Sequence, residues 1–174
     1  MPRHEFTGRW GFTTPSGIPK PIHRAFELLH AGGNQRLSAT PEPGGTCGSL
    51  ATAGTTFGAV QVVALANNTE PEAAAKPTGS MVFVSNNGRA GCNVTLFGLG
   101  ARGQAHALLH RIDSTHGNPY GLWQAWGSPS FPSLAQIKLL QAASRNTPEP
   151  FALTSGGDSA ELFVEPNALL VLVL

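Results

Sequence analysis

Charged side chains are scarce in this sequence. Asp, Glu, Lys and Arg make up 12% of the 174 residues, and the formal net charge is +1. Typical globular domains carry about 25% of these residues. A nucleic-acid-binding surface needs clustered Lys and Arg to neutralise phosphates, and the sequence holds no such cluster. We therefore expect no nucleic-acid partner.

A long hydrophobic run is also missing. The apolar run at Leu169–Leu174 is far shorter than the roughly 20 residues that span a bilayer. The first residues, Met1–Glu5, lead into a polar, glycine-rich stretch and not into the apolar core of a signal peptide. We expect no membrane association, and the sequence leaves the cellular compartment open.

Cysteine is nearly absent, with only Cys47 and Cys92. These two residues are either two separate thiols or the two halves of one disulfide in a secreted parent protein. Two Asn-x-Thr tripeptides, which begin at Asn67 and Asn93, are candidate N-glycosylation sites and favour a secreted or lysosomal parent. Such tripeptides are also frequent by chance, so both alternatives stay open.

Glycine and proline, in contrast, are plentiful, with 21 Gly and 14 Pro. Many turns and short strands follow from this composition, which favours a β-rich fold. We interpret the Ser-, Thr-, Pro- and Gly-rich residues 38–55 as a loop. Apolar or alternating patterns predict strands at residues 59–65, 80–84, 92–96, 105–112, 151–153, 160–164 and 168–174. The short spacing of the last three is typical of an antiparallel β-sandwich.

The sequence predicts two short helices. The first begins near Pro21, since proline is well tolerated in a first helical turn, and ends at Gly32. Its apolar side carries Ile22, Phe26 and Leu29.

The second predicted helix follows Ser133. The hydroxyl of Ser133 can cap the helix, and Gln136, three residues later, completes a capping box. Ile137 and Leu140 supply the apolar side, and the helix ends near Ser144.

Two motifs carry a resemblance to a known family. The first reads F-T-G-R-W-G-F at residues 6–12 and G-I-P-K-P-I-H-R-A-F-E-L-L-H at residues 17–30. The second consists of Arg111-Ile112-Asp113, Asn118-Pro119-Tyr120, Trp123, Gly127-Ser128-Pro129, Pro132, Gln136 and Ala143-Ser144. In this order they resemble glycoside hydrolase family 39, which includes β-xylosidases and α-L-iduronidases.

The resemblance implies a parent enzyme that hydrolyses the O-glycosidic bonds of xylosides or uronic-acid glycosides. Residues 1–36 would be the last loop and helix of its (β/α)₈ barrel, and residues 37–174 an accessory β-sandwich. A whole barrel takes about 250 residues. In the family, the two catalytic glutamates of the retaining mechanism lie upstream of the first motif, and no residue of this chain matches them. We therefore expect no catalytic residue and no activity from this chain alone, with a barrel or another chain as its partner.

Aromatic side chains are the candidate binding residues. Sugars stack on exposed aromatic rings because their C–H surfaces are apolar. Trp123 and Trp126 lie three residues apart near Tyr120, and they either form a sugar platform or pack the seam between the sandwich and the barrel that the resemblance implies. The resemblance places the loop with Phe6 and Trp10 at the substrate-binding rim of the parent barrel. A stand-alone carbohydrate-binding or protein-interaction module is therefore the alternative function.

His110, Asp113 and His116 form the densest group of metal-ligating residue types. A zinc site needs three or four converging ligands. We favour a structural role instead, in which Asp113 caps the turn at residues 114–118 and Arg111 pairs nearby. We expect neither a metal nor a cofactor.

Overall fold

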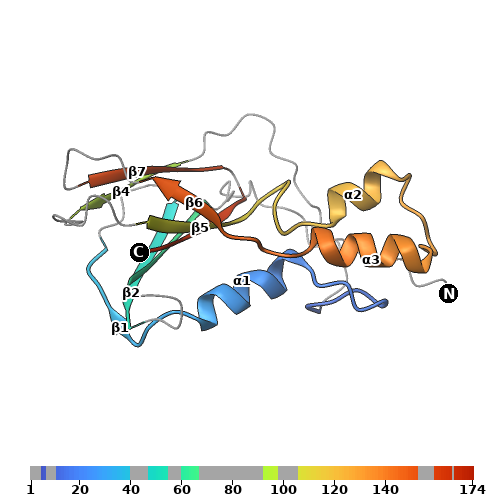
Figure 1. Cartoon of the computed structure of the whole chain (residues 1–174), viewed down its shortest axis with the longest axis horizontal. Coiled ribbons are helices and arrows are strands. Elements are labelled where there is room, and N and C mark those ends of the chain that lie inside the picture. Colours follow the sequence, from blue (N-terminus) through green and yellow to red (C-terminus); the bar gives the residue numbers. More distant parts are fainter. Residues whose placement is uncertain are drawn as a thin grey trace, which may run out of the picture.

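The chain forms antiparallel β-sheets with helices packed at one end and along one side (Figure 1). The computed structural model describes residues 5–6, 11–39, 47–54, 60–66, 92–97, 106–152, 159–165 and 167–174. The helices are α1 (Pro21–His30), α2 (Tyr120–Ala125) and α3 (Leu134–Ala143). The strands are β1 (Gln35–Arg36), β2 (Cys47–Ala53), β3 (Val60–Ala66), β4 (Cys92–Phe97), β5 (His106–Ile112), β6 (Glu149–Ala152), β7 (Ser159–Val164) and β8 (Leu169–Val173).

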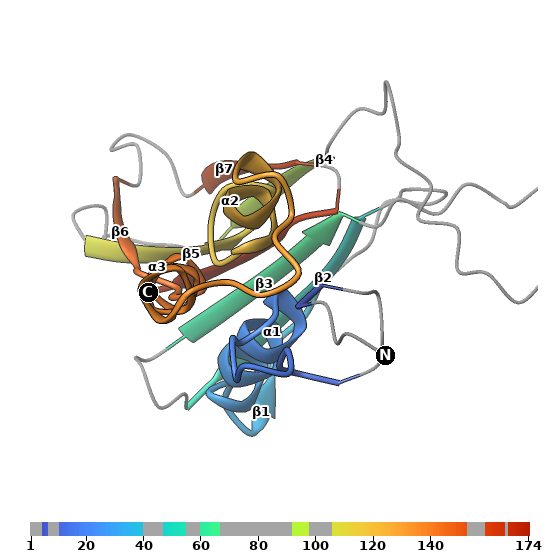
Figure 2. The ribbon, with the colours of Figure 1, turned by 90° about the vertical axis from the view of Figure 1, so that its right-hand side faces the viewer.

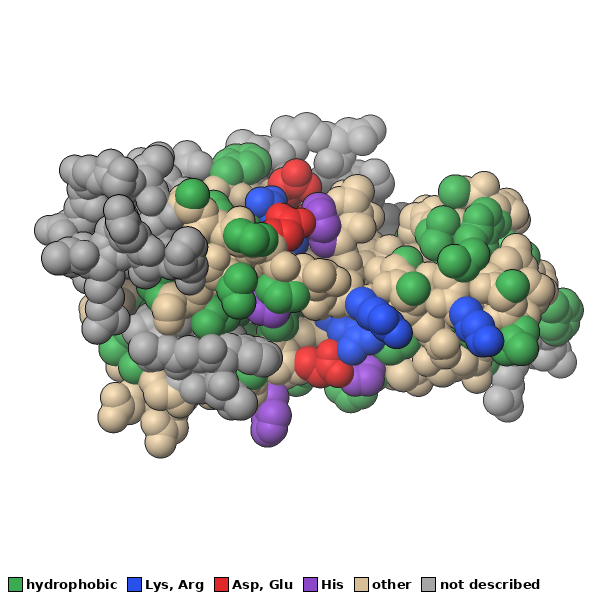
Figure 3. Space-filling model, in the orientation of Figure 1, with side chains coloured by type: hydrophobic (Ala, Val, Ile, Leu, Met, Phe, Trp, Pro, Cys, Tyr) green, Lys and Arg blue, Asp and Glu red, His purple; other side chains and the backbone are tan. Residues whose placement is uncertain are grey.

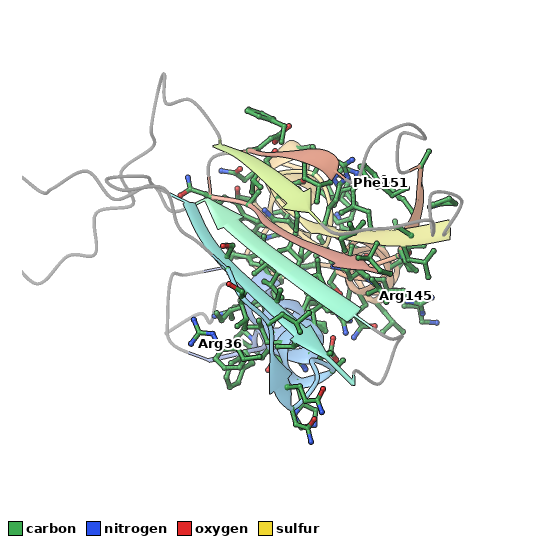
Figure 4. The ribbon with its side chains drawn as sticks, turned by 90° about the vertical axis from the view of Figure 1, so that its left-hand side faces the viewer. Arg36, Arg145 and Phe151 are labelled. Carbon is green, nitrogen blue, oxygen red and sulfur yellow. The ribbon has the colours of Figure 1, made fainter. Side chains whose placement is uncertain are left out.

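Six of these strands form one sheet in the order β1-β2-β3-β8-β5-β6, and β4 pairs with β7 in a second sheet. All of the pairings are antiparallel. Arg36 on β1 and Phe151 on β6 mark the two edges of the larger sheet in Figure 4. The predicted β-rich, antiparallel class is confirmed.

Strand β8 lies at the centre of the larger sheet and is buried on both faces. Leu170 and Leu172 belong to a core cluster that also contains Leu162 and Val164 of β7. On the opposite face, Val171 belongs to a second cluster that contains residues of α1 and β3. Because successive side chains of a strand point to opposite faces, a strand covered on both faces must be apolar throughout. This explains the uninterrupted apolar run at the end of the sequence.

Strand β2 contradicts the prediction of a loop at residues 38–55. Cys47–Ala53 pair with β3 along the whole strand, from Cys47↔Ala66 to Ala53↔Val60. The segment is rich in Gly, Ser, Ala and Thr and has little β-propensity of its own. Strand propensity depends on neighbours more than on the isolated residue, so pairing with the apolar β3 decides the outcome.

The other predicted strands that can be checked are confirmed as β3, β4, β5, β6, β7 and β8, with small changes in their ends. The strand predicted at residues 80–84 lies outside the described residues. Helix α2 was not among the two predicted helices. It is only six residues long and follows Pro119. A helix this short does not contain enough turns to show a helical spacing of apolar residues in the sequence.

Helix α1 begins at Pro21, as predicted, and its inner side packs on the larger sheet (Figure 2). Leu28 is 4% exposed and packs with Val63, Ile112 and Val171. The side chain of Arg24 also donates a hydrogen bond of 2.7 Å to the carbonyl of Ser144, just after α3. One side of α1 is therefore firmly attached to the rest of the molecule.

The close approach of α1 to β2 explains a glycine at the end of this helix. A Cβ atom on Gly33 would lie 1.7 Å from the carbonyl oxygen of Ala53. The Gly33 N–H also donates a hydrogen bond of 3.1 Å to the hydroxyl of Thr52. Only glycine fits between the helix end and the strand at this distance.

Helix α3 confirms the predicted capping box. The Ser133 hydroxyl accepts a hydrogen bond from the backbone N–H of Gln136, and the Gln136 side chain accepts one from the backbone N–H of Ser133. Leu140 is fully buried, and Ile137 packs beside it.

Candidate functional site

An aromatic cluster joins the N-terminal loop to α2. The ring of Phe6 lies 5.8 Å from that of Tyr120 and 5.3 Å from that of Trp123, measured between centroids. Tyr120 and Trp123 stack at 5.7 Å with an interplanar angle of 30°. Separations and tilts of this kind are favourable for aromatic pairs. Figure 3 shows apolar side chains gathered over α2 at this end of the molecule.

The same aromatic residues belong to a third core cluster, which links the N-terminal loop with α2 and α3. Its buried members are Ile18, Trp123 and Leu140, and Phe6 and Trp126 are partly buried against them. Three of the four predicted binding residues therefore meet in one place. Trp10, the fourth, lies outside the described residues.

Solvent exposure differs strongly within this cluster. Trp123 is 7% exposed, and its indole N–H donates a hydrogen bond of 3.1 Å to the carbonyl of Pro129. Tyr120 is 42% exposed and is the most accessible of the three clustered rings. A sugar would reach the ring of Tyr120 before that of Trp123. The role of these residues in binding stays a prediction.

Asp113 organises the turn between β5 and α2, as the sequence predicted. Its Oδ1 accepts hydrogen bonds of 2.7 Å from the backbone N–H groups of both Thr115 and His116. Burial of the carboxyl acts to raise the pKa of Asp113, but the hydrogen bonds from Thr115 and His116 outweigh it, so the pKa lies below its usual value. Asp113 is therefore a buried, charged cap.

His116 lies between two carboxylates. Its Nδ1 is 2.8 Å from Oδ2 of Asp113, and its Nε2 is 3.6 Å from Oε1 of Glu149 on β6. Arg111 completes this group, with its Nε 3.5 Å from Oε2 of Glu149. The ion pair predicted for Arg111 is thus formed with Glu149. Sequence reasoning gave no role to Glu149, because no local pattern links this proline-flanked residue to the distant turn.

His110 contacts an asparagine of the segment that follows α3. Its Nδ1 is 3.0 Å from the side-chain oxygen of Asn146, while the Asn146 amide donates to the carbonyl of Arg111. In the part of the chain that the structure describes, no three His, Cys, Asp or Glu residues converge in a way that could hold a metal ion.

Two further carboxylates of the described chain are engaged in local contacts. Glu27 pairs with Arg24 at 2.7 Å and lies 3.5 Å from Nε2 of His23. Glu5 accepts hydrogen bonds from the backbone N–H and the hydroxyl of Ser16. The contacts of Glu27 lie on the surface of α1, and those of Glu5 connect two parts of the N-terminal loop.

The predicted disulfide and glycosylation sites stay predictions. Cys47 begins β2 and Cys92 begins β4, but their side chains lie outside the described part. Asn93 is on β4 opposite Phe163, and its side chain is likewise not described. Asn67 lies outside the described residues. Among the described residues, no helix is long and apolar enough to cross a membrane.

Comparisons with known proteins place this chain in a family of glycosyl hydrolases. The model of Glycosyl hydrolases family 39 matches residues 1–158, so the chain belongs to family 39. A search of curated proteins gave no significant match.

Solved structures share the fold. A monomeric β-xylosidase from Caulobacter crescentus CB15 is 22% identical, with a TM-score of 0.69. A family 39 β-xylosidase from Caulobacter crescentus (20%, TM-score 0.63) and the family 39 enzyme from Xanthomonas axonopodis pv. citri (19%, TM-score 0.65) are also similar. Each alignment covers 98% of this chain but only 34%, 31% and 33% of the respective solved chain. The chain thus spans about a third of the length of these structures.

Proposed function

We propose that this chain is the C-terminal, non-catalytic portion of a family 39 glycosidase. In this proposal residues 1–36 are the last loop and helix of a (β/α)₈ barrel, and residues 37–174 are an accessory β-sandwich. The parent would hydrolyse the O-glycosidic bonds of xylosides or of uronic-acid glycosides by a retaining mechanism. Family membership and the β-xylosidase relatives support the reaction class. The catalytic glutamates would lie in the portion of the relatives that this chain does not span.

The observation that carries the proposal is the outer side of α1. Ile22, Phe26 and Leu29 are 47%, 53% and 40% exposed, although they form an apolar stripe. Phe12, which is 52% exposed, packs edge-on against Phe26 with ring centroids 5.3 Å apart. The apolar face of α1 is therefore wider than the part that the sheet covers, and contiguous exposed apolar residues mark interaction sites.

We infer that the covering partner is the catalytic barrel, supplied either by the same polypeptide or by another chain. The inner side of α1 is already occupied by the sheet, through Leu28, and by the end of α3, through Arg24. In the part of the chain that the structure describes, the side of α1 with Ile22, Phe26 and Leu29 is an exposed apolar surface that a further layer would cover. The length of the relatives, about three times that covered by this chain, supplies enough polypeptide for such a layer.

Co-expression tests this partner. The chain should co-purify with the portion of the Caulobacter β-xylosidase that it does not cover, and Phe26→Asp should reduce the recovered complex at least tenfold. Phe131→Asp is the matched control, because Phe131 is 78% exposed and lies between α2 and α3, away from the α1 stripe. Equal recovery of the complex with both variants would contradict docking through α1.

A carbohydrate-binding module is the second candidate function, and the exposed ring of Tyr120 beside Trp123 favours it. Binding of a sugar to Tyr120 would change the fluorescence of the stacked Trp123. We expect xylo-oligosaccharides or glycosaminoglycan fragments to change the emission of the wild-type chain and not of Tyr120→Ala. If no sugar changes the tryptophan emission of the wild-type chain, sugar binding at the aromatic cluster is excluded.

A further inference from the structure

The ring of Phe6 lies against the pair of rings formed by Tyr120 and Trp123. Its centroid is 5.3 Å from that of Trp123 at an interplanar angle of 55°, and 5.8 Å from that of Tyr120 at 69°. Phe6 is partly buried against the core cluster that contains Trp123. With Phe6 in this place Trp123 is only 7% exposed, whereas the neighbouring Tyr120 is 42% exposed. Phe6 therefore covers part of the Trp123 ring that a ligand could otherwise contact.

Two hydrogen bonds hold the residue that precedes Phe6. Glu5 is 4% exposed, and its Oε1 accepts a hydrogen bond from the hydroxyl of Ser16. Its Oε2 accepts a second hydrogen bond, of 3.3 Å, from the backbone N–H of the same serine. The two residues are 11 positions apart in the sequence. These bonds therefore tether the segment that carries Phe6 to another part of the N-terminal loop.

Ser16, at the other end of this tether, belongs to a tight turn. The backbone N–H of Thr14 donates a hydrogen bond of 2.9 Å to the carbonyl of Ile18, and the N–H of Gly17 donates one of 2.9 Å to the carbonyl of Thr14. Gly17 has a φ of +73°, a left-handed conformation that favours glycine. Ile18 is fully buried in the same core cluster as Trp123. The tether thus ends on a turn that is anchored in the core.

We propose that Glu5 and Phe6 form a self-inhibitory cover over a sugar-binding surface made by the rings of Tyr120 and Trp123. The apolar C–H face of a pyranose ring would stack on Trp123 in the place that Phe6 takes in this structure. The net contribution of a hydrogen bond is modest, because water competes for both partners. Local opening of the cover is therefore accessible to the folded chain. This inference rests on the carbohydrate-binding function proposed above and is independent of the glycosidase assignment.

The cover lowers the apparent affinity of this surface for sugar. A ligand that binds only the open form has an apparent dissociation constant (Kd) equal to the intrinsic value divided by the open fraction. Removal of the Phe6 ring, or a weaker tether at Ser16, increases that open fraction. Sugar binding should therefore become tighter when the cover is damaged. A purely structural role of the same residues would leave the affinity unchanged or lower it.

Isothermal titration calorimetry of the full chain with xylohexaose measures this effect. Phe6→Ala removes the covering ring and should lower Kd about tenfold or more, which corresponds to an open fraction of about 10% or less in the wild type. Ser16→Ala removes one of the two tethering hydrogen bonds and should lower Kd roughly threefold. Phe163→Ala is the matched control, because Phe163 is 58% exposed on β7, at the opposite end of the molecule from α2 (Figure 1). Its Kd should equal that of the wild type.

Thermal unfolding of each variant shows whether it is folded. If Phe6→Ala does not fold, Ser16→Ala decides the question, because it leaves every member of the core cluster in place. A wild-type chain that binds xylohexaose, with folded cover variants that bind equally or more weakly, would overturn the cover and leave the carbohydrate-binding function standing. Absence of binding by the wild type and by both cover variants would overturn both.

Discussion

Strand β8 and helix α1 are both rich in apolar residues, but they differ in how these residues are covered. Both faces of β8 are covered by the molecule itself, by β7 on one side and by α1 on the other. In α1, Leu28 is buried on the inner side, while Ile22, Phe26 and Leu29 stay exposed on the outer side.

The difference shows which element has its apolar side chains fully buried within this chain. A strand with two covered faces contributes its full apolar surface to stability, whereas α1 buries only part of its apolar face. The helix therefore carries apolar side chains beyond those that its contacts within this chain require. We attribute the surplus to a further layer of the parent protein, as proposed above.

Leucine truncation on the two elements should give the largest contrast. Leu172 of β8 is fully buried, so Leu172→Ala should lower the free energy of unfolding by about 2–5 kcal/mol. Leu29 of α1 is 40% exposed, so Leu29→Ala should cost about 0.5 kcal/mol or less. Urea unfolding of both variants checks this. Similar losses would mean that the outer side of α1 is already covered in solution.

Substitution of Gly33 tests the attachment of α1 to the sheet. A Cβ atom at this position collides with the backbone of Ala53, so Gly33→Ala should cost about 1–3 kcal/mol. Gly121 in α2 is the control, because its Cβ would meet only the carbonyl of Ser114 at 3.8 Å. Gly121→Ala should be neutral or stabilise by up to about 1 kcal/mol. Thermal unfolding distinguishes the two, and equal stability of both variants would contradict the close contact.

Acid unfolding probes the turn at Asp113, where a smaller effect is expected. The folded-state pKa of Asp113 is lowered, so its contribution is present above the unfolded-state pKa and is lost as the pH falls through the folded-state value. Asp113→Asn should destabilise the chain by about 1–2 kcal/mol at pH 7. This difference from the wild type should shrink below about pH 4. A difference that is constant from pH 7 to pH 2.5 would mean that the charge of Asp113 does not contribute.

Local sequence patterns predicted much of the fold. The capping box at Ser133, the proline at the start of α1 and the apolar pattern of β8 each encode their element within a few residues. Strand β2 could not be predicted in this way, because it depends on its pairing with β3. Helix α2 was missed because it is too short to show a helical period.

The candidate site was predictable only in part. The aromatic residues Phe6, Trp123 and Trp126 could be chosen by type, and the capping role of Asp113 by its position in a turn. The burial of Trp123 and the contact between His116 and Glu149 depend on how distant segments meet. No pattern in a single segment contains that information.

The most direct test of the central claim is a hydrolysis assay with the purified chain on p-nitrophenyl β-xyloside and a 4-methylumbelliferyl iduronide. The Caulobacter β-xylosidase serves as the positive control on the xyloside. We expect no hydrolysis by this chain, since the catalytic carboxylates would lie in the portion of the relatives that it does not span. Hydrolysis that survives repurification and is abolished by Asp113→Asn or Glu149→Gln would contradict this account and place a catalytic site in the chain itself.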